Sequence, residues 1–310
     1  MTAAACYADS ASCLSAEIVF NERIADGTWR IRVDCPALAA AATPGQFAMV
    51  RIPGRHDPLL GRPLAVYDTF PEGCGTAIAS SADHGPAAVR YVDFIYAVHG
   101  RFTTALREIP AGHGLVLWGP LGNGFRIPPV DHLLLVAGGI GQTALLSLGL
   151  ERLGRRTYGS AARKVPAAGR VTCCWGARHA GLFGGIDDYR AAGIEVHQAT
   201  LDGSAGLRGT VVDLLDQVVG TARRLPGDST TPGGGSMHVA CCGPDPMMAA
   251  VARWSAERGL RCDVSLEAPM ACGIGICFTC VARVRDGSGG WDYRRTCIEG
   301  PVFDAARIEW

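Results

Sequence analysis

Four cysteines near the carboxyl terminus have a spacing that suits metal chemistry. They follow the pattern C-x4-C-x2-C, then sixteen residues and a last cysteine: Cys272, Cys277, Cys280 and Cys297. This is the ligand pattern of a plant-type [2Fe-2S] centre, in which a tight loop presents three thiolates and a returning strand supplies the fourth. Gly273 and Gly275 let that loop wrap closely around sulfides. The alternative is a four-cysteine zinc site, but such sites are usually built from two separated C-x2-C knuckles.

Two glycine turns, each between an apolar strand and a helix, indicate a nucleotide site. The first turn contains Gly138, Gly139 and Gly141, and the second contains Cys242, Gly243 and Pro244. Such turns let a pyrophosphate approach backbone amides at the carboxyl edge of an α/β sheet. The alternative is that the glycines only pack a helix onto the sheet. No acidic residue ends the next strand, which closes with Arg178 nearby, so NADP remains open beside NAD.

An arginine in the first third of the chain leads an apolar strand, in the run RPLAVYDTF from Arg62. Such an arginine can form two hydrogen bonds with a phosphate while the strand after it lies along a flat ring system. Taken alone, an arginine at this position is more often a surface charge.

The elements that must position these residues predict three domains. After a flexible leader at 1–13, residues 14–130 contain short alternating strands separated by Gly and Pro, which favour an antiparallel β-barrel. Residues 131–263 alternate buried strands with helices, as in a doubly wound parallel sheet. Residues 264–310 form a small domain that the cluster would support. Two polar segments, 155–170 and 226–236, are predicted to be mobile surface insertions.

Composition limits the class of protein. The chain has 310 residues, is 48% hydrophobic and contains 29 acidic and 29 basic residues, so neither nucleic acid nor an anionic membrane is expected as a partner. Thirteen cysteines dispersed through a chain of this size predict reduced thiols rather than a disulfide framework. The leader lacks a basic start and a continuous apolar core, so we expect a cytoplasmic protein.

Together these runs resemble the ferredoxin-reductase superfamily. In order and spacing they are most similar to the electron-transfer subunits of NAD-linked, class 1B dihydroorotate dehydrogenases. The resemblance runs from about Ser15 to the end of the chain. It is carried by RPLA, GPLGNGF, LLLVAGGIG, TLDGS, ACCGPDPMM, and MACGIGICFTCV with a later RTC-x-x-GPVFD. The last stretch is the most specific, because reductases with an amino-terminal cluster module, or none, lack it there.

The resemblance implies FAD, a [2Fe-2S] cluster and NAD as cofactors. Arg62 would hold the FAD diphosphate, and the isoalloxazine would be bordered by Pro63, Leu64, Ala65, Val66 and Tyr67. The family usually has Ser or Thr at Ala65, so a hydroxyl contact to the flavin is replaced or absent. A second FAD element, G-x-G-T in relatives, is Gly100-Arg101-Phe102-Thr103 here, and Arg101 and Thr103 would supply side-chain donors. NAD would be lined by Gly138, Gly139, Gly141, Asp202, Cys242, Gly243 and Pro244.

The implied function is electron transfer in pyrimidine biosynthesis. Nicotinamides exchange hydride and iron–sulfur centres exchange single electrons, and a flavin between them can do both. The sequence shows no dihydroorotate or second-flavin motif, so an FMN-containing TIM-barrel partner is expected, in a heterotetramer with two copies of each chain. One alternative is a diaphorase-type subunit of an NAD(P)-linked hydrogenase, sulfide reductase or ferredoxin oxidoreductase. The other is a non-catalytic flavin and iron–sulfur redox sensor.

Overall fold

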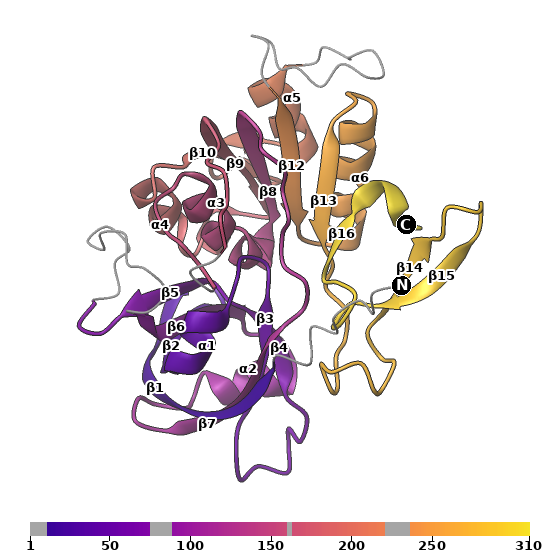
Figure 1. Cartoon of the computed structure of the whole chain (residues 1–310). Coiled ribbons are helices and arrows are strands. Elements are labelled where there is room, and N and C mark those ends of the chain that lie inside the picture. Colours follow the sequence, from indigo (N-terminus) through magenta and orange to yellow (C-terminus); the bar gives the residue numbers. More distant parts are fainter. Residues whose placement is uncertain (1–10, 75–88, 160–162, 221–235) are drawn as a thin grey trace.

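A computed structural model describes residues 11–74, 89–159, 163–220 and 236–310 (Figure 1). Within these ranges the chain forms a seven-stranded antiparallel sheet, a second seven-stranded sheet that is mostly parallel, and a two-stranded hairpin. This confirms the predicted barrel, doubly wound α/β domain and small carboxyl-terminal domain. No helix in the described part of the chain is long and apolar enough to cross a membrane.

The barrel has the strand order β4-β3-β7-β1-β2-β6-β5. Its elements are β1 (Ser12–Ala25), β2 (Thr28–Asp34), α1 (Pro36–Ala41), β3 (Phe47–Arg51), β4 (Arg62–Ala65), β5 (Asp68–Pro71), β6 (Val89–Ala97), α2 (Gly100–Leu106) and β7 (Gly114–Leu121). The run RPLAVYDTF is split into β4 and β5. Between them, the Val66 amide donates to the Gln46 carbonyl and the Tyr67 amide donates to the Asp93 carbonyl. These bonds join the two edges of the sheet and close the barrel.

The α/β domain has the strand order β11-β10-β9-β8-β12-β13-β16. Its elements are β8 (His132–Gly138), α3 (Leu146–Arg152), β9 (Arg170–Ala177), α4 (Ile186–Ala191), β10 (Glu195–Thr200), β11 (Leu207–Arg208), α5 (Val211–Val219), β12 (Met237–Cys242), α6 (Asp245–Ala256), β13 (Arg261–Ser265) and β16 (Val302–Asp304). Every residue of β8 is buried. Leu133 and Leu135 belong to the core shared with α3 and α4, and Leu134 and Val136 to the core shared with α5 and α6. The continuous apolar run is therefore buried on both faces, as predicted.

The carboxyl-terminal part is joined to the α/β sheet at both of its ends. It contains the hairpin of β14 (Val281–Arg285) and β15 (Trp291–Arg295), and then β16, which pairs antiparallel with β13. The predicted boundary between residues 263 and 264 falls inside β13, and β1 begins at Ser12, within the predicted leader. Figure 1 shows the hairpin extending away from the two larger domains.

The segment from Arg155, predicted to be a mobile surface insertion, is in part a packed element. Arg156 and Tyr158 are only 5% and 4% exposed, and both bind the carboxylate of Asp68 in the barrel. The prediction was wrong there because a charged, polar run resembles a solvated loop when its buried partner is on another domain. The second predicted insertion, 226–236, lies outside the described residues except for Ser236.

Candidate cofactor site

A cavity of about 720 Å³ lies where the barrel, the α/β domain and the cysteine loop meet. Its size suits a cofactor-sized ligand. Six predicted cofactor residues line it: Arg62, Pro63, Leu64, Ala65, Thr103 and Cys242. The opposite wall comes from the segment after β13 and the start of the cysteine loop, residues 265–271, with Thr279.

Arg62 leads β4 and presents an exposed guanidinium to this cavity. Its Nη1 donates to the Gly61 carbonyl at 3.1 Å, and it has no carboxylate partner among the residues that the structure describes. β4 pairs with β3, so Pro63 to Ala65 form a continuous wall beside the arginine. A cation without an anionic partner beside a largely apolar wall fits the diphosphate and the ring system of FAD.

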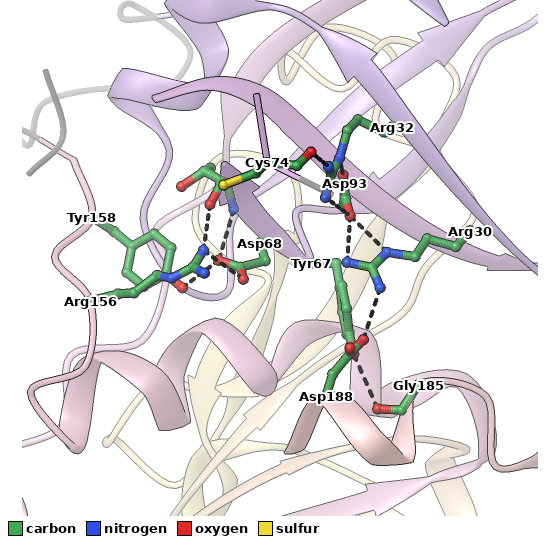
Figure 2. A network of polar contacts seen from close by, with 11 residues as sticks. Arg30, Arg32, Tyr67, Asp68, Cys74, Asp93, Arg156, Tyr158, Gly185 and Asp188 are labelled. Carbon is green, nitrogen blue, oxygen red and sulfur yellow. Dashed lines mark hydrogen bonds and ion pairs between the residues drawn. The ribbon is translucent and has the colours of Figure 1, made fainter. Parts of the chain in front are cut away.

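Val66 and Tyr67, also predicted to border the flavin, do not line the cavity. Val66 is 3% exposed, and Tyr67 is fully buried. The Tyr67 hydroxyl donates to Asp188 Oδ2 on α4 at 2.8 Å (Figure 2). Tyr67 therefore ties the end of the cavity wall to the α/β domain, whereas Val66 packs in the barrel core.

Two buried polar contacts, which we call the domain latches, join the barrel to the α/β domain (Figure 2). In the first, Arg30 donates from Nε to Asp93 at 2.7 Å and from Nη1 to Asp188 at 3.1 Å, so one guanidinium spans both domains. Burial raises the pKa of Asp188, and the Arg30 charge opposes that shift. Since Asp188 also accepts from Tyr67, the first latch fixes α4 against the barrel.

The second latch is centred on Asp68, the first residue of β5. Its Oδ2 accepts from Arg156 at 2.8 Å, and its Oδ1 accepts from the Tyr158 hydroxyl at 2.7 Å (Figure 2). Burial raises the pKa of Asp68 to about 6, although the Arg156 charge lowers it. Asp68 directly follows Tyr67, so both latches hold the same corner of the barrel.

The second predicted FAD element is only partly available. Thr103 lines the cavity, but its hydroxyl accepts from the His99 amide at 2.6 Å and donates to the His99 carbonyl at 2.8 Å. Arg101 is exposed and pairs with Asp57 at 2.9 Å. Gly100 has a φ of +77°, which favours glycine, and Phe102 is buried in the barrel core. This corner offers fewer free donors than the sequence predicted.

The two glycine turns lie against each other at the carboxyl edge of β8 and β12. A Cβ on Gly141 would overlap the Cys242 carbonyl, and a Cβ on Gly138 would overlap the Met247 side chain. Gly139 instead has a φ of +53° and open space around it. Packing therefore requires Gly138 and Gly141, while the positive φ of Gly139 favours glycine at that position.

Six of the seven predicted NAD residues lie outside the cavity wall, namely Gly138, Gly139, Gly141, Asp202, Gly243 and Pro244. A Cβ on Gly243 would come within 2.9 Å of the Gly138 Cα, so this glycine permits the close approach of the two turns. Pro244 is exposed at the amino-terminal end of α6. Asp202 is exposed after β10, where its Oδ1 accepts from the Ser204 amide at 2.9 Å.

Cys272 is half-buried and Cys277 is exposed, whereas Cys280 and Cys297 are both buried. The Cys277 amide lies 3.5 Å from Cys272 Sγ, while Cys280 and Cys297 are 1% and 0% exposed and hydrogen-bond to each other. Hydrogen bonds from the side chain and backbone of Thr279 lower the pKa of Cys277 to about 6, which favours its thiolate.

This arrangement fits a binuclear cluster better than zinc. A zinc site needs four ligands around one ion, whereas each iron of a [2Fe-2S] cluster takes two thiolates. Cys272, Cys277 and Cys280 on one loop, with Cys297 in the turn after β15, offer two thiolates for each iron.

Contacts with the barrel hold the cysteine loop. Gly273 and Gly275 have φ values of +71° and +81°, as their sequence positions predicted. A Cβ on Gly273 would lie 2.6 Å from Met49 Cγ on β3. Trp118 on β7 donates from Nε1 to the Cys272 carbonyl at 2.8 Å. Sequence reasoning missed Trp118, because only its position in the strand GLVLWG was visible and not what that strand faces.

Comparisons with known proteins agree with this site. Residues 267–309 match the family described as the iron-sulfur cluster binding domain of dihydroorotate dehydrogenase B. The "Dihydroorotate dehydrogenase B (NAD(+)), electron transfer subunit" of Bacillus caldolyticus is 32% identical over 92% of this chain and 94% of its own length. The protein of the same name from Desulforamulus reducens is 30% identical over 95% of this chain and 97% of its own length.

Solved structures show the same fold. An NADH-dependent reduced ferredoxin-NADP oxidoreductase superposes with a TM-score of 0.70 at 24% identity, covering 100% of this chain and 92% of that one. Phthalate dioxygenase reductase superposes with a TM-score of 0.56 at 15% identity, covering 96% of each chain. The match over nearly the whole length of relatives at 30% identity or more, together with the cysteine pattern and the three-domain cavity, shows that the chain belongs to the family of dihydroorotate dehydrogenase B (NAD(+)) electron transfer subunits.

Proposed function

We propose that this chain carries electrons from a dihydroorotate-oxidising catalytic subunit to NAD⁺, through a [2Fe-2S] cluster and an FAD that it binds itself. The observation that carries the proposal is the cavity bordered by the barrel, the nucleotide turns and the cysteine loop. A flavin there would adjoin both a hydride acceptor and a one-electron centre, and it can exchange electrons with each. The chain is thus an oxidoreductase subunit in pyrimidine biosynthesis.

We assign the roles of the site residues as follows. Arg62 binds the FAD diphosphate and Pro63 to Ala65 border the ring, supported by their place on the cavity wall. The nucleotide turns at Gly138 to Gly141 and at Cys242 to Pro244, with Asp202 beyond them, bind NAD. The four cysteines hold the cluster. The domain division is 14–130, 131–263 and 264–310 after a leader at 1–13, with β13 shared between the last two units.

The partner is an FMN-containing TIM-barrel subunit, with two copies of each chain in the complex. It docks over the apolar side chains that flank Cys277, which are Ile274, Ile276 and Phe278 at 38%, 73% and 62% exposure. Exposed apolar residues in one loop are typical of the centre of a protein interface. All twelve described cysteines are free, which supports the reducing environment of the cytoplasm.

The test is reconstitution of the full chain with a candidate FMN subunit. Adding dihydroorotate should bleach the flavin absorbance, produce the EPR signal of a reduced cluster and, with NAD⁺ present, form NADH. Cys277→Ser should abolish NADH formation while dihydroorotate still reduces the FMN subunit. NADH formation at the normal rate in this variant would refute the order of electron carriers.

Substitutions that place a charge on the proposed docking surface test docking separately. Ile276→Lys should weaken association with the FMN subunit by at least about tenfold, since it places a charge within a desolvated contact. Val19→Lys, on the exposed face of β1 at 41% exposure, is the matched control and should leave association unchanged. Equal association constants for the two variants would place the docking surface elsewhere.

A further inference from the structure

The reaction requires a proton that the proposed carriers do not bring. Electrons that arrive from an iron–sulfur cluster come without protons, whereas the hydride that leaves to NAD⁺ contains two electrons and one proton. For each pair of electrons, one proton must therefore enter the cavity from water and reach the flavin ring. This requirement rests on the proposed function.

Few groups in the cavity can supply that proton. β4 contributes Arg62, Pro63, Leu64 and Ala65, none of which releases a proton near neutral pH. Burial raises the pKa of Tyr96 and of Cys242 far above neutral, so both stay protonated. The titratable lining residues that remain are His99, before α2 on the barrel side, and Glu267.

Glu267 is the only carboxylate among the described residues that line the cavity. It follows β13, and its neighbours on the wall are Ser265 and the start of the cysteine loop. Its carboxylate stands where the nucleotide edge of the α/β sheet meets the cluster, with no described ion-pair partner. His99, in contrast, lies beside the phosphate-binding end, with its backbone engaged by Thr103.

The surroundings of Glu267 favour its protonated form. The Glu267 side chain is exposed to the cavity, but desolvation of its carboxyl by the protein around it raises its pKa, and the like charge of Asp245 at the start of α6 adds to that shift. The Cys242 thiol faces it from β12, and Arg62 and His99 face the same cavity from the barrel. A glutamic acid that keeps its proton closer to neutral pH is a better general acid.

We propose that Glu267 delivers the proton that accompanies cluster-derived electrons to the flavin. In this step an O–H bond of the Glu267 carboxyl breaks, an N–H bond on the flavin ring forms, and water reprotonates the carboxylate. The electrons come from the cluster, and the hydride that leaves then carries this proton to NAD⁺. The same residue is not needed when NADH reduces the flavin, because hydride brings its own proton.

That asymmetry gives the test, carried out on the full chain loaded with FAD and cluster. Stopped-flow absorbance compares reduction of the flavin by NADH with reduction by the methyl viologen radical, which supplies electrons only. Glu267→Gln should leave the NADH reaction within about twofold of wild type. It should slow the viologen reaction by about 100-fold, the lower end of the range for loss of a general acid. Glu267→Asp should restore most of the viologen rate.

Asp245→Asn is the matched control, since it removes a neighbouring negative charge but leaves the proton donor in place. The viologen reaction should stay fast in this variant. Equal slowing of both reactions in Glu267→Gln would mean that Glu267 has a structural or nucleotide-binding role, and no slowing of either would mean that the proton takes another path. Both outcomes overturn the inference and leave the proposed function intact.

A second readout does not depend on electron transfer. In the flavin-free chain, the infrared difference spectrum between wild type and Glu267→Gln should show the carbonyl band of a protonated carboxyl that persists above the usual glutamate pKa, while the bands of buried Asp68 and Asp188, which both proteins share, should cancel. A difference spectrum without this band would mean that Glu267 does not hold the proton and would overturn the inference. Failure of the wild-type chain to bind FAD, or of NADH to reduce it, would instead overturn the proposed function and this inference with it.

Discussion

The barrel meets its two neighbouring domains through interfaces that differ in their polar contacts. Against the α/β domain it packs apolar side chains such as Phe70 and also uses the buried charges of the domain latches, Arg30 with Asp188 and Arg156 with Asp68. Against the carboxyl-terminal domain, Met49 and Leu121 pack on Met270 and the buried cysteines, Trp118 donates to the Cys272 carbonyl, and Asn123 hydrogen-bonds with the backbone of residues 299–302. Both interfaces border the same cavity, so packing holds the flavin site on both sides, with buried ion pairs added on the first and neutral hydrogen bonds on the second.

The difference corresponds to what each interface must hold in place. Hydride transfer needs reacting atoms about 3–3.5 Å apart and aligned, and charge-assisted hydrogen bonds fix direction as well as distance. Electron transfer to a cluster needs no direct contact between donor and acceptor. Packing and neutral hydrogen bonds are sufficient on that side.

The largest expected effect is on the side of the cysteine loop. Cys280→Ser should abolish cluster binding, because water cannot reach this buried position to replace the missing thiolate ligand. Without the cluster, the cysteine loop that packs on the barrel should become disordered. Iron content, visible absorbance and the rate of proteolysis at the loop measure this. Cys262→Ser, at another buried cysteine on β13, should keep a full complement of iron. Retained iron in Cys280→Ser would show that this thiol is not a ligand.

The next largest effect is expected when a substitution removes one of the domain latches. Arg156→Met should lower the free energy of unfolding by about 3–5 kcal/mol, because it leaves Asp68 buried without its cation. Arg190→Met, at an exposed pair with Asp187, should cost no more than about 1 kcal/mol. Denaturant titration of both variants is the measurement. Similar losses of unfolding free energy in the two variants would mean that the buried ion pair stabilises the fold no more than the exposed one.

A pH dependence follows from the same carboxylate. Burial raises the pKa of Asp68 from 3.8 in the unfolded chain to about 6 in the folded one. The folded state therefore holds this proton more tightly, and the stability it provides is complete below about pH 4 and is lost as pH rises through about 6. The shift corresponds to about 3 kcal/mol. Unfolding free energies measured between pH 4 and 7 should show this component in wild type and lack it in Asp68→Asn.

The smallest effect tests the hydrogen bond across the interface with the cysteine loop. Trp118→Phe keeps most of the ring but removes the donor to the Cys272 carbonyl, so it should cost about 1 kcal/mol. Cluster content should stay complete, with a modest change in its midpoint potential, which depends on hydrogen bonding around the centre. Loss of the cluster in this variant would show that the bond, and not the packing, holds the loop.

The sequence predicted the features that depend on local pattern. The apolar run HLLLVAG became β8, and the glycines of the cysteine loop adopted positive φ. The domain latches escaped prediction because their partners, Arg156 with Asp68 and Arg30 with Asp188, are 88 and 158 residues apart in the chain. Arg156 and Asp188 carry charges that would be solvated in isolation, and only the folded arrangement of domains buries them. Glu267 escaped for a similar reason. An acidic residue after a strand is common in sequences, and only the folded structure shows that this one lines a cavity.

The walls of the cavity come from residues as far apart as Gly45 and Pro301. A growing chain that had been translated only to the end of β13 would have Arg62 and the glycine turns but would lack the segment that closes the opposite wall. Flavin binding therefore requires that residues 265–301 have been synthesised and have folded against the barrel.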